Sequence, residues 1–119
     1  MRRVYLILFC CSLFIACGSE QNIRKEPENL ISKQDFTSLL VEMQLIEAAH
    51  AKGFFRDKDS TSTIEVQYAN LFGKYQITKE DFEDNLEFYY DFSGQMEEIY
   101  NDVLNELVKQ EAQLKEIKK

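Results

Sequence analysis

The sequence predicts an all-α fold, a small bundle of about four helices that ends in a long C-terminal helix. From Leu30 onward, apolar residues recur every three or four positions, which is the spacing of amphipathic helices. No segment shows the two-residue alternation of a strand, and no internal repeat is present in the sequence. Roughly 90 residues follow Leu30, which is enough for one domain with a modest core.

The first helix is expected to begin near Ser32 and to end at Gly53. Ser32 and Asp35 have the spacing of a capping box, and glycine is common just past a helix C-terminus. The apolar face of this helix comprises Phe36, Leu39, Leu40, Met43 and Ile46. We expect this face to line the core.

Two shorter helices should follow the polar segment 56–62. The second helix has an apolar face of Ile64, Tyr68, Leu71 and Tyr75, and Gly73 weakens its last turn. Thr78 is expected to cap the third helix, whose first turn holds acidic residues that the helix dipole favours. The apolar residues of the third helix fall on two faces, with Phe82, Leu86 and Tyr89 on one and Phe88 and Phe92 on the other.

The fourth helix, about residues 95–118, would be roughly 36 Å long. Its apolar residues repeat at spacings of three and four, interrupted by Gln110: Tyr100, Val103, Leu107, Leu114 and Ile117. Such a helix is expected to pack along a neighbour, and its last turns should extend beyond the core.

The amino-terminal segment is typical of a bacterial lipoprotein signal. Arg2 and Arg3 precede a largely apolar run of 13 residues, Val4 to Ala16, which is shorter than the roughly 20 residues that span a bilayer. The run ends in Phe14-Ile15-Ala16-Cys17, which resembles a lipobox. We therefore expect residues 1–16 to be a cleaved signal peptide and Cys17 to carry the lipid. An ordinary secretory signal with an incidental cysteine is the alternative.

Residues 17–29 are then the lipidated cysteine and a flexible tether, because they lack apolar periodicity and contain the only proline, Pro27. Residues 30–119 form the helical domain. Two or three acyl chains hold a protein stably on a membrane, so the membrane is an expected partner.

Composition argues against several classes of function. Without residues 1–16 the chain has 12 basic and 21 acidic residues, a charge of −9, so nucleic acid is not an expected partner. Cys10 and Cys11 would leave with the signal, and the sulfur of Cys17 would become a thioether, so no free thiol remains for a disulfide, a metal site or catalysis. A single histidine, isolated glycines and solvated acidic residues offer no triad, phosphate loop or acid–base pair. We expect no enzyme activity, no cofactor and no small-molecule substrate.

Glu47-Ala-Ala-His50 has the spacing that places a carboxylate and an imidazole on one helix face, as in half of a di-iron site. His50 is the only histidine, so only a symmetric dimer could complete such a site. Both side chains are expected to project toward the apolar face of the first helix. The structural alternative is that this helix leaves the core near its end and that tyrosines of a neighbouring helix bind Glu47 and His50. We favour that alternative and expect no metal.

Asp59-Ser60-Thr61 resembles the acceptor sequence of periplasmic O-glycosylation in Bacteroidota, with Ser60 as the modified residue. A plain turn before the second helix is the favoured alternative.

Aromatic residues are more numerous than one helix face can bury. Internal packing or contact with a protein partner would account for them, and the candidate partner surface comprises Phe54, Phe55, Phe88, Tyr90 and Phe92.

Almost the whole chain after Cys17 resembles a family of small Bacteroidota lipoproteins, the domain of unknown function 4296. The similar segments are Pro27 to Ser32, Met43 to Ala49, Tyr75 to Phe82, Tyr89-Tyr90 and Ile99-Tyr100. Family members usually have glycine or a similar residue where this chain has Gln76. The resemblance implies no catalytic residues. It implies an envelope lipoprotein of a diderm bacterium, and accessory helical lipoproteins there often serve β-barrel assembly or secretion.

We therefore expect a non-catalytic, lipid-anchored envelope lipoprotein that serves as an accessory or adaptor subunit of an outer-membrane assembly or secretion complex and binds an envelope protein. The periplasmic face is favoured over the cell surface, because Glu20 alone is a poor version of the acidic cluster that resembles a surface-export signal. The alternatives are a periplasmic chaperone that holds unfolded clients in an apolar groove and a dimeric metalloenzyme using Glu47 and His50.

Overall fold

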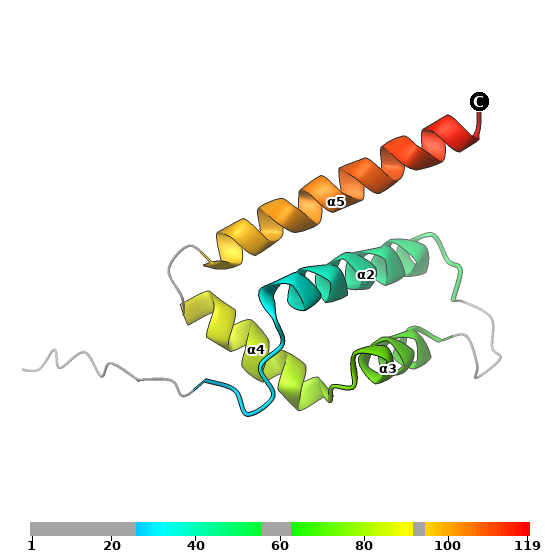
Figure 1. Cartoon of the computed structure of the whole chain (residues 1–119). Helices are drawn as coiled ribbons and strands as arrows, with labels where there is room; N and C mark the ends of the chain where they lie inside the picture. The colour runs from blue at the N-terminus through cyan, green and yellow to red at the C-terminus, as the bar shows by residue number, and fades with distance from the viewer. Residues whose placement is uncertain (1–25, 56–62, 92–94) are drawn as a thin grey trace, which may run out of the picture.

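The structure, a computed structural model, describes residues 26–55, 63–91 and 95–119. Within these ranges the chain forms four α-helices and no strand. They are α2 (Lys33–Ala51), α3 (Ile64–Tyr75), α4 (Lys79–Asp91) and α5 (Gln95–Ile117) (Figure 1). The predicted all-α bundle with a long C-terminal helix is confirmed.

Side-chain caps begin two of the helices where the sequence predicts them. Ser32 Oγ accepts a 3.1 Å hydrogen bond from the amide of Asp35 and donates one of 2.7 Å to Asp35 Oδ2. Thr78 and Asp81 form a similar pair at the start of α4. Thr78 Oγ1 accepts from the Asp81 amide at 3.0 Å, and here the backbone amide of Thr78 also donates to Asp81 Oδ2, at 2.7 Å. Each pair satisfies amide groups that have no partner inside the helix.

The ends of α2 and α3 share one geometry with different residues. After α2, Gly53 has φ 84°, its amide donates to the carbonyl of His50, and the next amide donates to the carbonyl of Ala49. After α3, Gln76 takes the equivalent left-handed position with φ 54° and ψ 42°. A side chain with a Cβ is strained in that conformation, whereas glycine is not.

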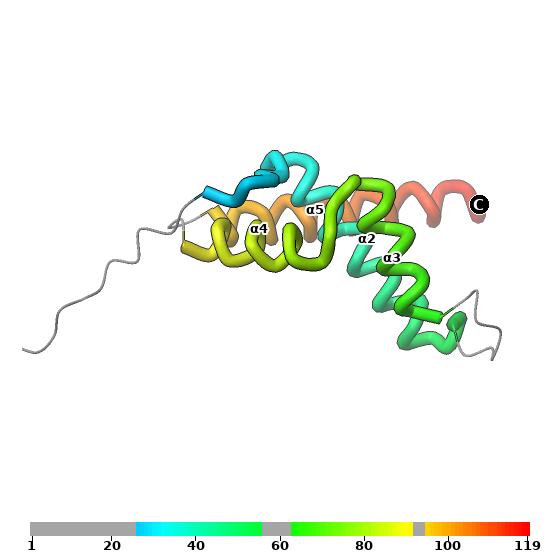
Figure 2. The backbone as a smooth tube through the Cα atoms, turned by 90° about the horizontal axis from the view of Figure 1, so that it is seen from below, coloured from blue at the N-terminus to red at the C-terminus, as the bar shows by residue number. Residues whose placement is uncertain are grey.

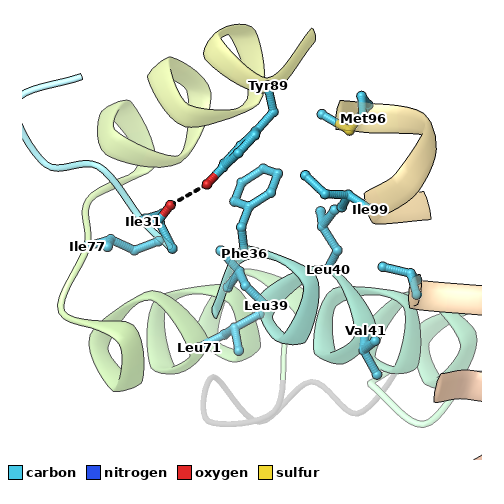
Figure 3. Packing of buried hydrophobic residues seen from close by; sticks show 11 residues of the cluster. Ile31, Phe36, Leu39, Leu40, Val41, Leu71, Ile77, Tyr89, Met96 and Ile99 are labelled. Carbon is cyan, nitrogen blue, oxygen red and sulfur yellow. Dashed lines mark hydrogen bonds between the residues drawn. The ribbon is translucent and has the colours of Figure 1, made fainter. Parts of the chain in front are cut away.

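Helix α2 lies between α3 and α5, and α4 follows α3 and leads to the start of α5 (Figures 1 and 2). The core gathers around the first half of α2 (Figure 3). Phe36 is fully buried, and its ring stacks on those of Tyr89 and Phe82 at centroid distances of 4.9 and 5.9 Å. The buried hydrophobic residues are Ile31, Phe36, Leu39, Leu40, Val41, Leu71, Ile77, Tyr89, Met96, Ile99 and Val103.

The core differs from the predicted faces at two helices. In α2, Val41 is buried although it lies off the predicted face, and Met43 and Ile46 are only partly buried. In α5, Met96, Ile99 and Val103 are buried, whereas Tyr100 is exposed. The reason is that α2 is flanked on two sides, so neighbouring helices cover residues that the strongest apolar stripe does not include.

Candidate protein-binding surface

Helix α5 carries exposed apolar residues on its outer side. Tyr100, Leu104 and Val108 follow one another at four-residue steps and all are exposed, with Leu104 at 60% and Val108 at 64%. Tyr90, in the last turn of α4, adjoins them, because its hydroxyl oxygen lies 3.2 Å from that of Tyr100. We call Tyr90, Tyr100, Leu104 and Val108 the outer stripe. It lies on the helix that forms one edge of the bundle (Figure 1).

The end of α5 carries a second exposed apolar region, Leu114 and Ile117, which we call the overhang. These residues follow Val103 and Ile99 by whole numbers of helical turns, so they continue the side of α5 that is buried in its first half. Ile117 is nevertheless 81% exposed. The prediction that the last turns extend beyond the core is confirmed, and the overhang is a core-like face that no described helix covers.

Charge is distributed unevenly along α5. Residues 95–106 contain four acidic residues and no basic one, and residues 107–119 contain four lysines and two glutamates. Ion pairs within the helix join Lys115 to Glu111 at 2.7 Å and Lys109 to Glu106 at 3.5 Å. The hydrogen bond and positive charge of Lys115 lower the pKa of Glu111 below its usual value. The first half of α5 is thus acidic, whereas its second half, residues 107–117, balances two lysines against two glutamates, and Lys118 and Lys119 follow its end.

The segment before α2 is held on α4 by a buried asparagine. Asn85 is fully buried, its Oδ1 accepts from the amide of Ile31 at 2.8 Å, and its Nδ2 donates to the carbonyls of Asn29 at 2.8 Å and Asp81 at 2.7 Å. Tyr89 donates its hydroxyl hydrogen to the carbonyl of Ile31 at 2.6 Å (Figure 3). We call residues 29–31 the strap. The end of the predicted tether is therefore attached to the domain at a defined place.

Sequence reasoning did not identify Asn85 as a structural residue. The sequence contained a signal for this role, because Asn85 lies beside Phe82 and Tyr89 on the predicted apolar face of the third helix. An amide on such a face must find hydrogen-bond partners, since burying it without them costs free energy.

A polar seam joins α2 to α3. Glu42 accepts hydrogen bonds from Tyr75 at 2.9 Å and from Lys74 at 2.6 Å. Burial raises the pKa of Glu42, but the hydrogen bonds from Lys74 and Tyr75 outweigh it and leave the pKa below its ordinary value. Burial and the bond to Glu42 raise the pKa of Tyr75 to about 12. These shifts belong to a structural contact between helices.

Glu47 and His50 are not buried in the core, although they follow Phe36, Leu40 and Met43 along the same face of α2. Both are exposed, because the end of α2 extends past the core. Glu47 accepts a hydrogen bond from Tyr68 of α3, as the structural alternative predicts, and the ring of His50 stacks on Phe55 at 6.5 Å. Among the described residues no group of three or more histidine, cysteine, aspartate or glutamate side chains is placed to hold a metal ion.

The predicted aromatic partner residues do not form one surface. Phe54 is 71% exposed and follows the end of α2, whereas Tyr90 belongs to the end of α4, and these two ends lie on opposite sides of the bundle (Figure 1). Phe88 is partly buried and meets the ring of Tyr89 edge-on at 5.4 Å. Phe55 is half-buried against His50. Cys17, Ser60 and Phe92 lie outside the described residues.

The described part of the chain also forms a groove of about 820 Å³ between α2 and α5. Val41 is the only apolar residue that lines it. The other lining residues are Lys33, Gln34, Thr37, Ser38, Glu42, Asp102, Asn105, Glu106, Lys109 and Gln110.

A family model described as a domain of unknown function (DUF4296) matches residues 27–113. The chain belongs to this family. The DUF4296 match begins just before the strap and includes Asn85, so the strap lies within the family domain. It ends one residue before Leu114 and thus contains the outer stripe but not the overhang. No curated protein and no solved structure matches the chain.

In the parts of the chain that the structure describes, none of the helices has the length and apolar character needed to cross a membrane.

Proposed function

We propose that this DUF4296 protein is a non-catalytic Bacteroidota lipoprotein that acts as an accessory or adaptor subunit of an outer-membrane assembly or secretion complex. The observation that carries the proposal is the overhang. Leu114 and Ile117 extend the apolar side of α5 beyond the described helices that cover its first half. Exposed apolar surface on a soluble domain commonly marks a contact with another protein.

The sequence supports a location at the membrane. The lipobox predicts an acyl anchor on Cys17, and eight residues, 18–25, lie between Cys17 and Glu26, the first described residue. The nine residue-to-residue steps from Cys17 to Glu26 span at most about 32 Å. Because Asn85 and Tyr89 hold the strap on α4, the domain would stay close to the membrane. The periplasmic face is the side that we favour. Tethering raises the effective concentration of the overhang for proteins in the same membrane.

The two alternatives receive less support. A chaperone for unfolded clients would use a broad apolar groove, but polar and charged side chains dominate the groove between α2 and α5. A metalloenzyme would need Glu47 and His50 as ligands, but Glu47 is bound to Tyr68 and His50 stacks on Phe55. We therefore favour a protein partner.

The proposal is tested by recovering the full-length, tagged protein from membranes with its native anchor and identifying co-purified proteins by mass spectrometry. We expect a defined set of envelope proteins, and the double variant Leu114→Gln, Ile117→Gln should lose them. Leu45→Gln is the matched control, because Leu45 is an exposed leucine on α2. Recovery of this protein alone, or equal recovery by the double variant, would contradict the proposal.

A further inference from the structure

The strap is attached to α4 through side chains. Asn85 binds the amide of Ile31 and the carbonyl of Asn29, and Tyr89 binds the carbonyl of Ile31 (Figure 3). Within the described residues, no hydrogen bond between two backbone groups joins residues 29–31 to a helix. The strap can therefore leave α4 without breaking any backbone hydrogen bond of the described helices.

The start of α2 does not depend on the strap either. Ser32 and Asp35 form the cap of this helix between themselves, and the amide of Phe36 donates to the carbonyl of Ser32 at 2.8 Å. All of these bonds lie on the helix side of the strap. Asn85 would stay bound to its own helix, and water would reach its other polar atoms once the strap had left. Opening of the strap thus leaves no polar group buried without a partner.

One apolar side chain opposes the opening. Ile31 is only 7% exposed and belongs to the same buried cluster as Tyr89 and Phe36. Release of the strap would transfer the Ile31 side chain to water, which is unfavourable. We therefore expect the strap to be closed in most molecules and open in a minority, as is common for a segment that few contacts hold.

We propose that the strap is a latch that opens while the four helices stay folded and thereby lengthens the tether. With the strap closed, the free chain ends at Asn29, and the 12 steps from Cys17 to Asn29 span at most about 42 Å. With the strap open, the free chain ends at Ser32, and the 15 steps from Cys17 to Ser32 span at most about 53 Å. The point where the chain leaves the domain also moves from α4 to the start of α2.

Tension on the lipid anchor favours the open latch, because opening lengthens the chain between the anchor and the domain. A partner that moved the bound domain away from the membrane would apply such tension, so this use of the latch rests on the proposed function. The opening itself does not. The pull reaches Asn29 before Ile31, so it loads the hydrogen bonds of the strap one after the other.

The first test measures hydrogen exchange of the purified full-length protein in detergent at low concentrations of urea. The Ile31 amide should exchange at least tenfold faster than the amide of Leu40, a buried residue of α2. Its rate should also depend little on urea, because a local opening exposes little surface. If the two amides exchanged at the same rate with the same urea dependence, the strap would open only when the whole domain unfolds, and the proposal would be wrong.

The second test follows the position of the strap with spin labels on Glu28→Cys and Gln44→Cys, because both residues are exposed. Double electron–electron resonance should give one narrow distribution of distances between the labels in the otherwise unchanged chain. Adding the double change Asn85→Ala, Tyr89→Phe should broaden the distribution, while circular dichroism shows an unchanged helix content.

The matched control is Asn70→Ala, Tyr100→Phe, which removes the same groups from exposed positions and should keep the distribution narrow. Tyr89→Phe alone keeps the ring that stacks on Phe36 and should broaden the distribution in part. A distribution that stayed narrow in the Asn85 and Tyr89 double variant, or a loss of helix together with the strap, would overturn the latch. Neither result bears on the adaptor role, which the recovery of partners from membranes tests separately.

Discussion

At the scale of single residues, Asn85 decides where the domain begins. Its side chain uses one acceptor and two donors to bind the backbone of Ile31, Asn29 and Asp81. A buried polar group contributes stability only while its partners remain, and its loss leaves those partners unsatisfied. The Asn85 side chain thus holds the strap through two hydrogen bonds and binds its own helix through a third.

Asn85→Ala should lower the free energy of unfolding by about 2–4 kcal/mol, because it leaves the amide of Ile31 and the carbonyl of Asn29 without their partner. Urea denaturation measures the loss, and hydrogen exchange should show faster exchange at the Ile31 amide. Asn101→Ala, at an exposed asparagine of α5, is the control and should change stability by less than about 0.5 kcal/mol. A variant at Asn85 as stable as the parent protein would contradict this account of the strap.

Gln76 holds a backbone conformation that favours glycine. Gln76→Gly should raise the free energy of unfolding by about 0.5–1 kcal/mol, because φ 54° is strained for a residue with a Cβ. Asn70→Gly, within α3, provides a control of opposite sign and should lower stability by about 0.5 kcal/mol. Thermal or urea unfolding of both variants tests the pair. If both glycine variants were destabilised, the left-handed cap would not be the dominant effect.

At the scale of the elements, the contacts of α2 differ from side to side. Against α5 and α4 it buries apolar side chains, whereas its outer contacts with α3 include hydrogen bonds from Tyr68 to Glu47 and from Tyr75 to Glu42. Burial and these carboxylates raise the pKa of both tyrosines to about 12. The stability of the contact between α2 and α3 should therefore depend on pH in the alkaline range.

Stability should fall as the pH rises, because the folded protein favours the protonated form of both tyrosines. The folded protein holds both phenols in the protonated state more firmly than the unfolded chain, where the pKa is 10.0. Their contribution to stability is complete below pH 10 and is lost as the pH rises toward 12. Urea unfolding between neutral pH and pH 12, with tyrosinate absorbance followed in parallel, measures the loss.

The matched comparison for the alkaline loss is the double variant Tyr68→Phe, Tyr75→Phe. It should be less stable than the parent at neutral pH, because both interhelical hydrogen bonds are missing. Its stability should also fall less between pH 10 and pH 12. If both proteins lost the same free energy of unfolding between pH 10 and pH 12, the loss would come from titrating groups other than Tyr68 and Tyr75.

At the scale of the whole molecule, the proposed function combines one anchor with one small domain. The domain offers two exposed apolar regions on α5, and the strap fixes where the tether joins it. If the domain is anchored, the outer stripe and the overhang can contact only proteins that are at the same membrane. The anchor is therefore expected to control the activity as strongly as either surface.

Cys17→Ser should move the protein from the membrane fraction to the soluble fraction, because the acyl anchor would be missing and the domain offers no described membrane-crossing helix. Cys11→Ser is the matched control and should leave the protein on the membrane, since residue 11 would be removed with the signal peptide. Immunoblots of separated fractions measure the distribution. A membrane-bound Cys17→Ser protein would contradict lipid anchoring at this residue.

Local sequence determined much of the architecture. Ser32 and Thr78 begin helices, and Gly53 ends one, because caps and left-handed turns depend on a few neighbouring residues. The extension of α5 past the core was predictable for the same reason, since its helical pattern outlasts the other helices. The lipobox that ends at Cys17 is also a local sequence pattern, and lipid attachment at Cys17 stays a prediction.

Only the tertiary structure decided which side chains meet. Val41 is buried because α5 covers a second side of α2, and Tyr100 is exposed because it lies on the side of α5 away from its buried residues. The apolar periodicity within each helix does not specify which side its neighbour covers. The strap residues that Asn85 binds lie 54 and 56 residues away in the chain, so local sequence patterns could not predict the strap. The sequence by itself determined the helices and the expected anchor, because those depend on neighbouring residues. The core, the strap and the two exposed regions of α5 were decided by packing between distant segments.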